Sequence, residues 1–269
     1  MWICTHAFHL PKRGSQESEY EDAFFPDGVF QRDLSEFRCA VADGASESAF
    51  SGKWARLLVR WYCRRRVTLE SLQRLWLRFA TRFPAPWYLE EKVRRGAHAA
   101  FVGLSIRDGQ PSEPFGGSWE VEAVGDSCFF HVRGNELLTA VPISKSDEFD
   151  NSPHLVSTDT STSATSTSAT STSDASTPFG LVESRLLVFS GEWRPRDSFY
   201  LLTDAFAQWT LAEHEAGRSP WEMFRGLRHA DDPGDGDAGH RCFQTVVAEL
   251  RERGGLHNDD TTLLRVEVA

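Results

Sequence analysis

Five short acidic segments, each beside an apolar run, constrain this chain more than any other feature of its sequence. Three of them follow apolar runs: Val41-Ala42-Asp43-Gly44, Val124-Gly125-Asp126-Ser127 and Leu202-Thr203-Asp204-Ala205. Two precede apolar runs: Glu21-Asp22 before Ala23, and Asn258-Asp259-Asp260-Thr261 before Leu263. Carboxylates that meet at strand ends repel one another, which costs free energy unless cations lie between them. Paired Mg²⁺ or Mn²⁺ ions would hold them together, because both ions prefer oxygen ligands. The pattern is typical of a metal-assisted hydrolase.

The order and spelling of these segments resemble the metal-dependent protein phosphatases of type 2C. That family carries, in order, an acidic pair ending in "ED", a "DG", a "GDS", a "TDG" or "SDG", and a "DN" or "DD" that opens the last strand. The same order stands here at Glu21-Asp22, Asp43-Gly44, Gly125-Asp126-Ser127, Thr203-Asp204-Ala205 and Asp259-Asp260. One Asp-Gly alone is usually a turn, whereas five motifs in order between about Glu21 and Val268 are a specific signature.

The resemblance implies a role for each acidic position. Asp43 would bridge two metal ions, with the backbone carbonyl of Gly44 beside it. Asp204 and Asp259 would hold the second ion, and these three aspartates would form the catalytic set. Glu21 and Asp22 would act mainly through metal-bound waters, and Asp126 would share a third, weaker ion with Asp204. The implied cofactors are therefore two Mn²⁺ or Mg²⁺ ions, with a third in some relatives.

The chain departs from the family pattern at two functional positions. Where many members place a proton-donating histidine directly after "DG", this chain has Ala45, and His257 is the nearest substitute as general acid. Where relatives hold substrate phosphate with an arginine, this chain has Glu17. Arg13 or Lys12 could bind the phosphate instead, since either cation neutralises a phosphate and an arginine does so bidentately.

Hydrophobic periodicity predicts strands at 37–42, 119–124, 128–132, 137–138, 186–189 and 199–202. We expect a hairpin through the turn at 133–136, and a second strand pair formed by 186–189 and 199–202. Helices are predicted at 52–66, 87–106, 205–215, 221–228 and 239–253, with a solvated basic face on the first. Strands bunched at both ends with helices between them indicate an α+β fold, a four-layer αββα sandwich of two mostly antiparallel sheets flanked by helices. The resemblance implies the same fold, with the metals in the cleft between the sheets.

A Ser/Thr repeat interrupts these patterns. Ser161-Thr162-Ser163-Ala164-Thr165 is repeated at 166–170 and begins again at 171. Such a tract cannot bury enough apolar area to order itself, so we expect a disordered insertion at about 157–177 within a single domain spanning 1–269. It is either a linker without a role or a phosphorylatable lid over the cleft.

Charge and cysteine content exclude several classes of function. The formal net charge is −10, whereas a nucleic-acid binder held by phosphate contacts needs a basic surface. The five cysteines are odd in number and contain no Cys-x-x-Cys pair, which favours a reducing compartment. No run approaches the ~18 apolar residues of a membrane span. We therefore expect a soluble, cytoplasmic protein without a nucleic-acid or membrane partner.

The sequence therefore predicts a metal-dependent protein serine/threonine phosphatase acting in signalling. It would hydrolyse phosphoserine and phosphothreonine with a metal-activated water, and its partners would be phosphorylated proteins, the substrates of a Ser/Thr kinase. Three alternatives stay open at this point. One is a pseudophosphatase that binds phosphoproteins as a regulator, one is a small-molecule phosphohydrolase, and the weakest is an adaptor domain with incidental carboxylates.

Overall fold

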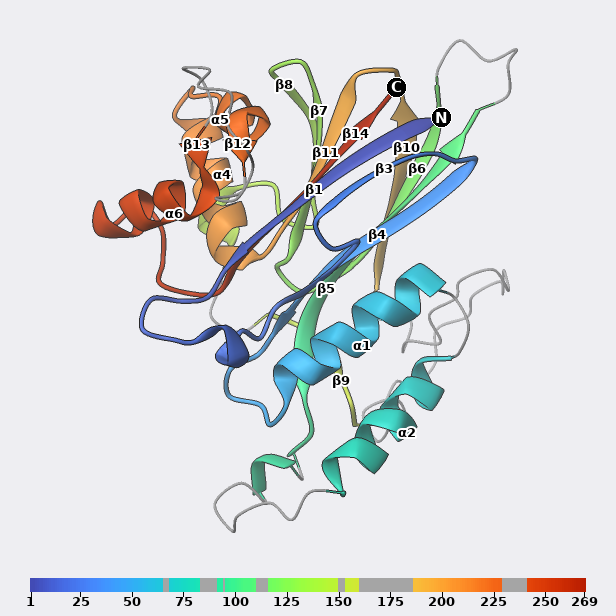
Figure 1. Ribbon diagram of the computed structural model, residues 1–269, viewed down its shortest axis with the longest axis vertical. Helices are drawn as coiled ribbons and strands as arrows, with labels where there is room; N and C mark the ends of the chain where they lie inside the picture. Colours follow the sequence, from blue (N-terminus) through green and yellow to red (C-terminus); the bar gives the residue numbers. More distant parts are fainter. Residues whose placement is uncertain are drawn as a thin grey trace.

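A computed structural model describes residues 1–64, 68–82, 91–93, 95–109, 116–149, 153–159, 186–228 and 241–269. Two large antiparallel sheets face each other, with helices on both outer sides (Figure 1). Sheet 1 has the strand order β3 (Val29–Asp33), β1 (Trp2–Leu10), β14 (Thr261–Val268), β11 (Asp197–Leu202), β7 (Cys128–Arg133) and β8 (Glu136–Val141). Sheet 2 has the order β10 (Leu187–Trp193), β6 (Gly117–Val124), β5 (His98–Asp108), β4 (Glu36–Gly44) and β2 (Ala23–Phe25), with β9 (Val156–Ser157) paired to β5.

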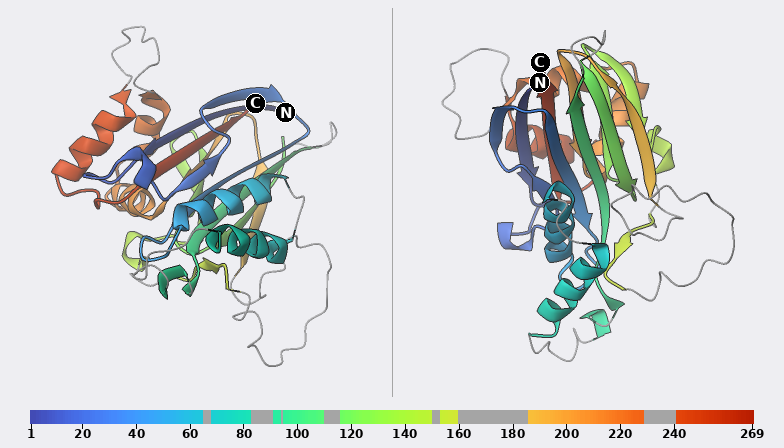
Figure 2. Two further views of the ribbon diagram at one scale, coloured as in Figure 1. Left: turned by 60° about the horizontal axis from the view of Figure 1, so that its bottom comes forward. Right: turned by 90° about the vertical axis from the view of Figure 1, so that its right-hand side faces the viewer.

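The helices divide between the two sheets. Helices α1 (Ser51–Arg64) and α2 (Leu69–Ala80) lie on sheet 2, and α4 (Asp204–Glu215), α5 (Pro220–Gly226) and α6 (Phe243–Glu252) lie on sheet 1. Figure 2 (left) shows the strands between these two groups. The short elements are η1 (Glu17–Glu19), η2 (Ser146–Glu148) and the parallel pair β12 (Leu227–Arg228) and β13 (Arg241–Cys242). The predicted four-layer αββα architecture is confirmed.

Three apolar layers hold the sandwich together. The middle layer fills the space between the sheets with side chains such as Val41, Val102 and Leu264. The outer layers pack α1 and α2 against sheet 2 through Trp54, and the other helices against sheet 1 through Phe206. Burial of these apolar side chains supplies the main stabilisation. Each Å² of apolar surface removed from water contributes roughly 25 cal/mol to the free energy of folding.

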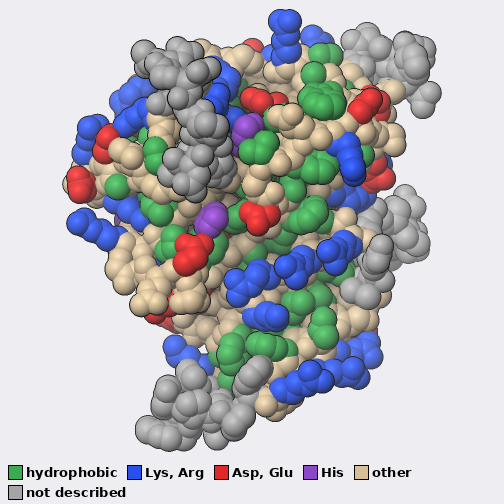
Figure 3. Space-filling model, viewed as in Figure 1, with side chains coloured by type: hydrophobic (Ala, Val, Ile, Leu, Met, Phe, Trp, Pro, Cys, Tyr) green, Lys and Arg blue, Asp and Glu red, His purple; other side chains and the backbone are tan. Residues whose placement is uncertain are grey.

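The basic face predicted for the first helix is exposed. Arg56, Arg60 and Arg64 point to solvent, whereas Trp54 and Trp61 are buried on the opposite side of α1. Figure 3 shows Lys and Arg side chains in a row over this helix.

No helix within the described ranges is both long and apolar enough to cross a membrane.

The helix predicted at 87–106 is wrong over its second half, because His98–Asp108 form β5 in the middle of sheet 2. The strand is buried on both faces: Val102 packs between the sheets and Phe101 packs under α1. A run that is apolar on both faces carries no two-residue alternation, so periodicity could not separate strand from helix. Residues 83–90 and 94 lie outside the described residues.

The helix missed by the sequence reading is α2. It begins after Thr68, whose side-chain Oγ1 accepts a hydrogen bond from the backbone N–H of Ser71 at 3.3 Å. This N-cap is the start signal that could have identified it. The predicted helix at 205–215 is confirmed as α4, whereas 227–228 form a strand rather than the end of α5, and α6 begins at Phe243.

The strand pair predicted from 186–189 and 199–202 is also wrong. Strand β10 pairs with β6 in sheet 2, and β11 pairs with β14 and β7 in sheet 1. The connection between them therefore crosses from one sheet to the other. The hairpin predicted around 133–136 is confirmed by the pairing of β7 with β8. Of the insertion predicted at 157–177, Ser157 ends β9 and residues 160–177 lie outside the described residues.

Asp197 anchors the crossing between the sheets. This fully buried carboxylate accepts hydrogen bonds from Arg133 Nε and Nη2 at 2.8 and 2.9 Å, and its Oδ2 lies 2.8 Å from His131 Nε2. The backbone N–H of Arg194 adds a bond of 2.8 Å. Burial alone would raise the pKa of Asp197, but these bonds hold it well below its ordinary value.

Replacing Asp197 with asparagine should therefore destabilise the fold by about 2–3 kcal/mol at pH 7, the value of charge-assisted hydrogen bonds lost around a buried group. Because the folded-state pKa is depressed, this stabilisation is complete above the unfolded pKa of about 3.9 and is lost as the pH falls below it. Urea unfolding at several pH values measures the effect. The exposed Asp33→Asn serves as the control and should change stability by less than about 0.5 kcal/mol. A constant difference between Asp197→Asn and the parent down to pH 3 would contradict the assignment.

Candidate metal centre

All five acidic segments lie at one end of the sandwich. In sheet 2, β4 ends at Asp43-Gly44, and Asp43 pairs with Ala100, next to the residue that pairs with Val124 at the end of β6. In sheet 1, Leu202 at the end of β11 pairs with both Leu263 of β14 and Cys128 of β7. The connection from β6 to β7 carries Asp126 from one sheet to the other. The segments that the sequence singled out are therefore neighbours in space, although up to 240 residues separate them in the chain.

Asp43 lies at the electrostatic centre of this group. Burial raises the pKa of its carboxyl well above the ordinary value, and four other carboxylates raise it further: Asp22, Asp204, Asp126 and Asp259. The four come from both sheets. A carboxylate in such a position is unfavourable as an anion unless a cation compensates it. The arrangement of charges therefore favours bound cations.

Asp204 follows β11 and opens α4. Burial is the main cause that raises its pKa to about 6, and the carboxylate of Asp259 adds to it. The N–H of Ala205, the nearby His257 and a hydrogen bond with the Asp43 carboxyl oppose this rise. His257 is thus close enough to act on Asp204 electrostatically, while its side chain is exposed to solvent.

Asp22 stands on a buried polar network. Its Oδ2 accepts a hydrogen bond of 2.6 Å from Thr262 Oγ1, and the N–H of Thr262 donates to Thr203 Oγ1 at 3.0 Å. The hydroxyl of Tyr20 also bonds to Thr262 Oγ1. The other carboxylate oxygen, Asp22 Oδ1, is buried without a hydrogen-bond partner among the described residues. A buried oxygen that lacks a donor is the atom that a metal or a metal-bound water would satisfy.

Glu21 is held at the edge of the site. Its carboxylate accepts hydrogen bonds from Ser46 Oγ at 2.5 Å and from Ser51 Oγ. Lys12 Nζ lies 3.6 Å from the same carboxylate and donates to Ser46 Oγ at 3.1 Å. The two serines follow Asp43-Gly44 closely in sequence, but nothing in their spacing indicated this contact.

Gly44 and Gly125 let the backbone reach these positions. A Cβ at Gly44 would lie 2.7 Å from the carbonyl oxygen of Glu21 and 2.8 Å from the backbone of Ser51. Gly125 has a φ of +94°, and a Cβ there would lie 2.7 Å from that of Ala100. Neither position accepts a side chain without movement of backbone. The glycines of "DG" and "GD" therefore serve chain packing at the site.

The two adjacent aspartates before β14 do different things. Asp260 is buried and accepts hydrogen bonds from the backbone N–H groups of Lys12 at 2.8 Å and Glu21 at 2.7 Å, so it ties two loops to β14. Asp259 is half-exposed, and its Oδ1 accepts the N–H of Asp260 at 2.8 Å. Asp259 also raises the pKa of Asp43, which places its charge beside the group. Asp260 is a positioning residue that the sequence reading did not identify.

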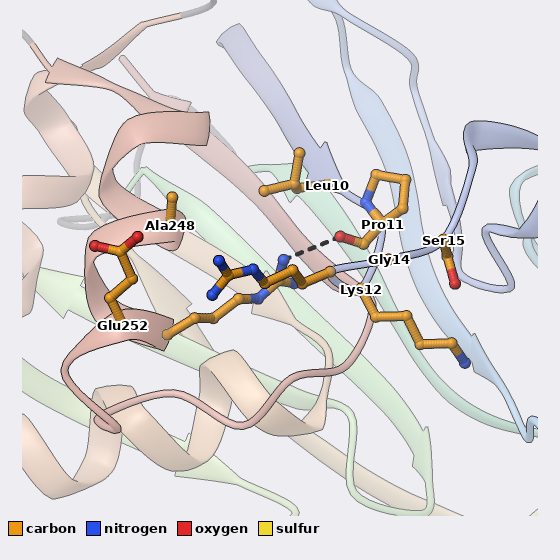
Figure 4. Close-up of a pocket in the computed structure, with 9 residues that line it drawn as sticks. Leu10, Pro11, Lys12, Gly14, Ser15, Ala248 and Glu252 are labelled. Atoms are coloured by element: carbon orange, nitrogen blue, oxygen red, sulfur yellow. Dashed lines mark hydrogen bonds between the residues drawn. The ribbon is translucent and has the colours of Figure 1, made fainter.

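The two cations considered for phosphate binding lie on one loop but differ in surroundings. Lys12 reaches the acidic group through Glu21 and Ser46. Arg13 is exposed, its backbone N–H donates to Asn258 Oδ1 at 2.7 Å, and it helps to line a surface pocket of about 320 Å³ with residues of α6, including Arg251 and Glu252. Figure 4 shows the Lys12 side chain extending from this loop away from Glu252. The role of Arg13 in phosphate binding stays a prediction, and Lys12 is the cation adjacent to the acidic residues.

The donor set fits hard divalent cations. Every candidate ligand is an oxygen, which suits Mg²⁺ and Mn²⁺. Within the described residues, no three of these carboxylates bring ligand atoms within 4.8 Å of one another, and the one His/Cys/Asp/Glu group that does so lies elsewhere. Water molecules and the carbonyl of Gly44 would have to complete the coordination, as Mg²⁺ commonly requires.

No protein-family model and no curated protein sequence matches the chain. Solved structures do match it. PppA, a key regulatory component of T6SS in Pseudomonas aeruginosa, is 15% identical with a TM-score of 0.53, over 100% of this chain and 99% of that chain. The Mycobacterium tuberculosis serine/threonine phosphatase PstP/Ppp is 13% identical with a TM-score of 0.50, over 100% and 99%.

The catalytic domain of PstP in complex with 2 manganese ions is 14% identical with a TM-score of 0.49, over 99% of each chain. At these identities the likeness concerns the fold. The chain thus has the fold of the type 2C protein phosphatases, as its motifs predicted.

Proposed function

We propose that this protein is a Mn²⁺- or Mg²⁺-dependent phosphatase that hydrolyses phosphoserine and phosphothreonine in proteins. The observation that carries the proposal is the gathering of Asp22, Asp126, Asp204 and Asp259 from both sides of the sandwich around the half-buried carboxylate of Asp43. Carboxylates that raise one another's pKa repel as anions, and bound divalent cations would relieve that repulsion. The shared fold supports phosphatase chemistry in preference to other uses of such a cluster.

The residues divide into ligands and supports. Asp43, Asp204 and Asp259 would hold two ions, with the carbonyl of Gly44, while Glu21 and Asp22 act through water. Asp126 would hold a third, weaker ion. Bound divalent cations would neutralise phosphoryl oxygens and make water acidic enough to attack at neutral pH. Ser46, Ser51 and Thr262 keep the carboxylates oriented through the hydrogen bonds described above.

Basic side chains beside the acidic group could protonate the leaving group and bind the substrate phosphate. His257 is exposed and close enough to act electrostatically on Asp204, so its imidazole could protonate the leaving alkoxide. Lys12 stands beside Glu21 and could meet a phosphate oxygen, with Arg13 as the bidentate alternative on the same loop. Substrates of a Ser/Thr kinase are the proposed partners. The five free cysteines support a reducing, cytoplasmic setting within signalling.

Two departures from the family pattern favour a second function, a pseudophosphatase that binds phosphoproteins. Glu17 stands where relatives carry the phosphate-binding arginine, and its carboxylate contacts His9 Nε2 at 2.9 Å instead of entering the acidic group. Ala45 stands where many carry the histidine. Either loss weakens turnover more than it weakens metal binding.

The deciding measurement is phosphate release from a phosphothreonine peptide by the full chain in Mn²⁺, compared with release from a small aryl phosphate and with binding of the peptide. We expect turnover of both compounds, with a higher kcat/KM for the peptide. Peptide binding without phosphate release would establish the pseudophosphatase. A preference for the small compound alone would favour a small-molecule phosphohydrolase.

A further inference from the structure

A second group of potential metal ligands lies on the outer face of sheet 1. Cys4 and His6 are alternate residues of β1 and therefore point to the same face. Glu267 of β14 is the direct pairing partner of Cys4. Glu267 lies near the far end of β14, about 20 Å of strand beyond Thr261, where the strand begins after Asp259 and Asp260. This cluster is thus distinct from the acidic group at the other end of β14.

The spacing of the three side chains suits one small ion. One ligand atom from each, the Cys4 Sγ, a His6 ring nitrogen and a Glu267 carboxylate oxygen, lie within 4.8 Å of one another. Cys4 Sγ and His6 Nε2 are 3.5 Å apart. Tetrahedral zinc with bonds of about 2.3 Å to sulfur and about 2.0–2.1 Å to nitrogen would hold these two atoms about 3.6 Å apart. The pair already has the separation of two ligands on one zinc ion.

The surroundings support a sulfur ligand and an open position. Gln31 Nε2 on the neighbouring β3 donates a hydrogen bond of 3.4 Å to Cys4 Sγ, the kind of contact that stabilises a metal-bound thiolate. Arg265 Nε lies 3.8 Å from Glu267 Oε1 and limits the freedom of that carboxylate. All three candidate ligands are half-buried, so an ion held by them would remain accessible from solvent.

We propose that Cys4, His6 and Glu267 form a binding site for Zn²⁺ or a similar borderline transition-metal ion, with a fourth position open to water or a partner's side chain. Thiolate and imidazole select zinc over Mg²⁺, whereas the all-oxygen group at the other end of the sandwich suits Mg²⁺ and Mn²⁺. Binding replaces the thiol proton of Cys4 by the metal and releases that proton to solvent. The chain would then carry two metal sites of different chemical preference.

The test is titration of the full-length protein with Co²⁺ as a spectroscopic substitute for zinc, in excess Mg²⁺ that occupies the oxygen site. A thiolate ligand gives Co²⁺ a strong near-ultraviolet charge-transfer band, which carboxylates cannot give. We expect this band to saturate at one equivalent and to disappear when Zn²⁺ is added. Gln31→Ala should weaken Co²⁺ binding by about 10-fold, as expected for loss of a contact to a ligand atom.

Matched variants separate this site from other thiols and from the oxygen site. Cys4→Ser and His6→Ala should lose the band, each checked for folding by circular dichroism. Cys242→Ser, which changes another half-buried cysteine, and Asp43→Asn should keep it. Absence of the band in the parent protein, or its persistence in Cys4→Ser, would overturn the proposal.

Discussion

Replacing Asp43 with asparagine should lower kcat for the phosphothreonine peptide by about 10²–10³, equivalent to about 3–4 kcal/mol of transition-state stabilisation. The change is nearly isosteric but removes the negative charge at the centre of the group, where Asp43 interacts with carboxylates of both sheets. Steady-state kinetics at saturating Mn²⁺ measures the effect. The exposed Asp33→Asn, which removes one charge at a distant strand, should keep the parent's kcat.

Stability separates this catalytic effect from unfolding. Burial and like charges raise the pKa of Asp43, so the ionised carboxylate destabilises the metal-free fold. Asp43→Asn should therefore unfold at the same temperature as the metal-free parent or at a higher one, while Mn²⁺ should stabilise the parent more than the variant. A loss of activity below threefold would show that Asp43 is not at the reacting centre.

Chelation should reduce hydrolysis of the same peptide to the uncatalysed background. The proposed site offers only oxygen ligands, so bound metals would supply the charge neutralisation at Asp43, whose electrostatic neighbours Asp22, Asp204, Asp126 and Asp259 are all acidic. Addition of Mn²⁺ or Mg²⁺ to the chelated and desalted protein should restore the rate, and Zn²⁺ should not be required. Phosphate release is the measurement, with circular dichroism before and after chelation as the control for folding.

Restoration of activity identifies the site that is used. If Mn²⁺ alone returns the full rate to both the parent and Cys4→Ser, hydrolysis depends on the acidic group and not on the thiolate cluster. Full turnover in excess chelator would contradict the metal dependence, whatever the state of the second cluster.

The positions of the acidic residues could be predicted because each stands where a buried strand begins or ends, which is a local pattern. The supporting contacts could not. Thr262 bonds to Asp22 across 240 positions of the chain, and Asp260 joins Lys12 across 248. Such partners are set by strand pairing, and neither residue type nor spacing indicates them. The metal roles of the acidic residues remain predictions.

The wrong predictions for β5 and for the pairing of β10 with β11 also come from tertiary contacts that the sequence does not show. β5 is covered on both faces, so its sequence lacks the alternation that marks a half-buried strand. The strands β10 and β11 are neighbours in sequence but belong to opposite sheets, and the buried Asp197 at the start of β11 bonds to Arg133 of β7 in sheet 1. The turn at 194–197 contains Pro195 and Asp197, residue types that favour a hairpin. The sequence does not show that the Asp197 carboxylate has its partners in sheet 1.

The division of the acidic group between the two sheets links its geometry to the apolar layer between them. Asp43 ends β4 of sheet 2, and Asp204 follows β11 of sheet 1 at the start of α4, so the distance between their carboxylates depends on how the two sheets align. Interdigitated side chains such as Val102 and Leu264 resist sliding, because close-packed interiors are nearly incompressible. The packing between the sheets would thus fix the geometry of the proposed ion site. A partner that bound the outer helices could change ion affinity by shifting one sheet against the other, or by moving α4, which begins at Asp204.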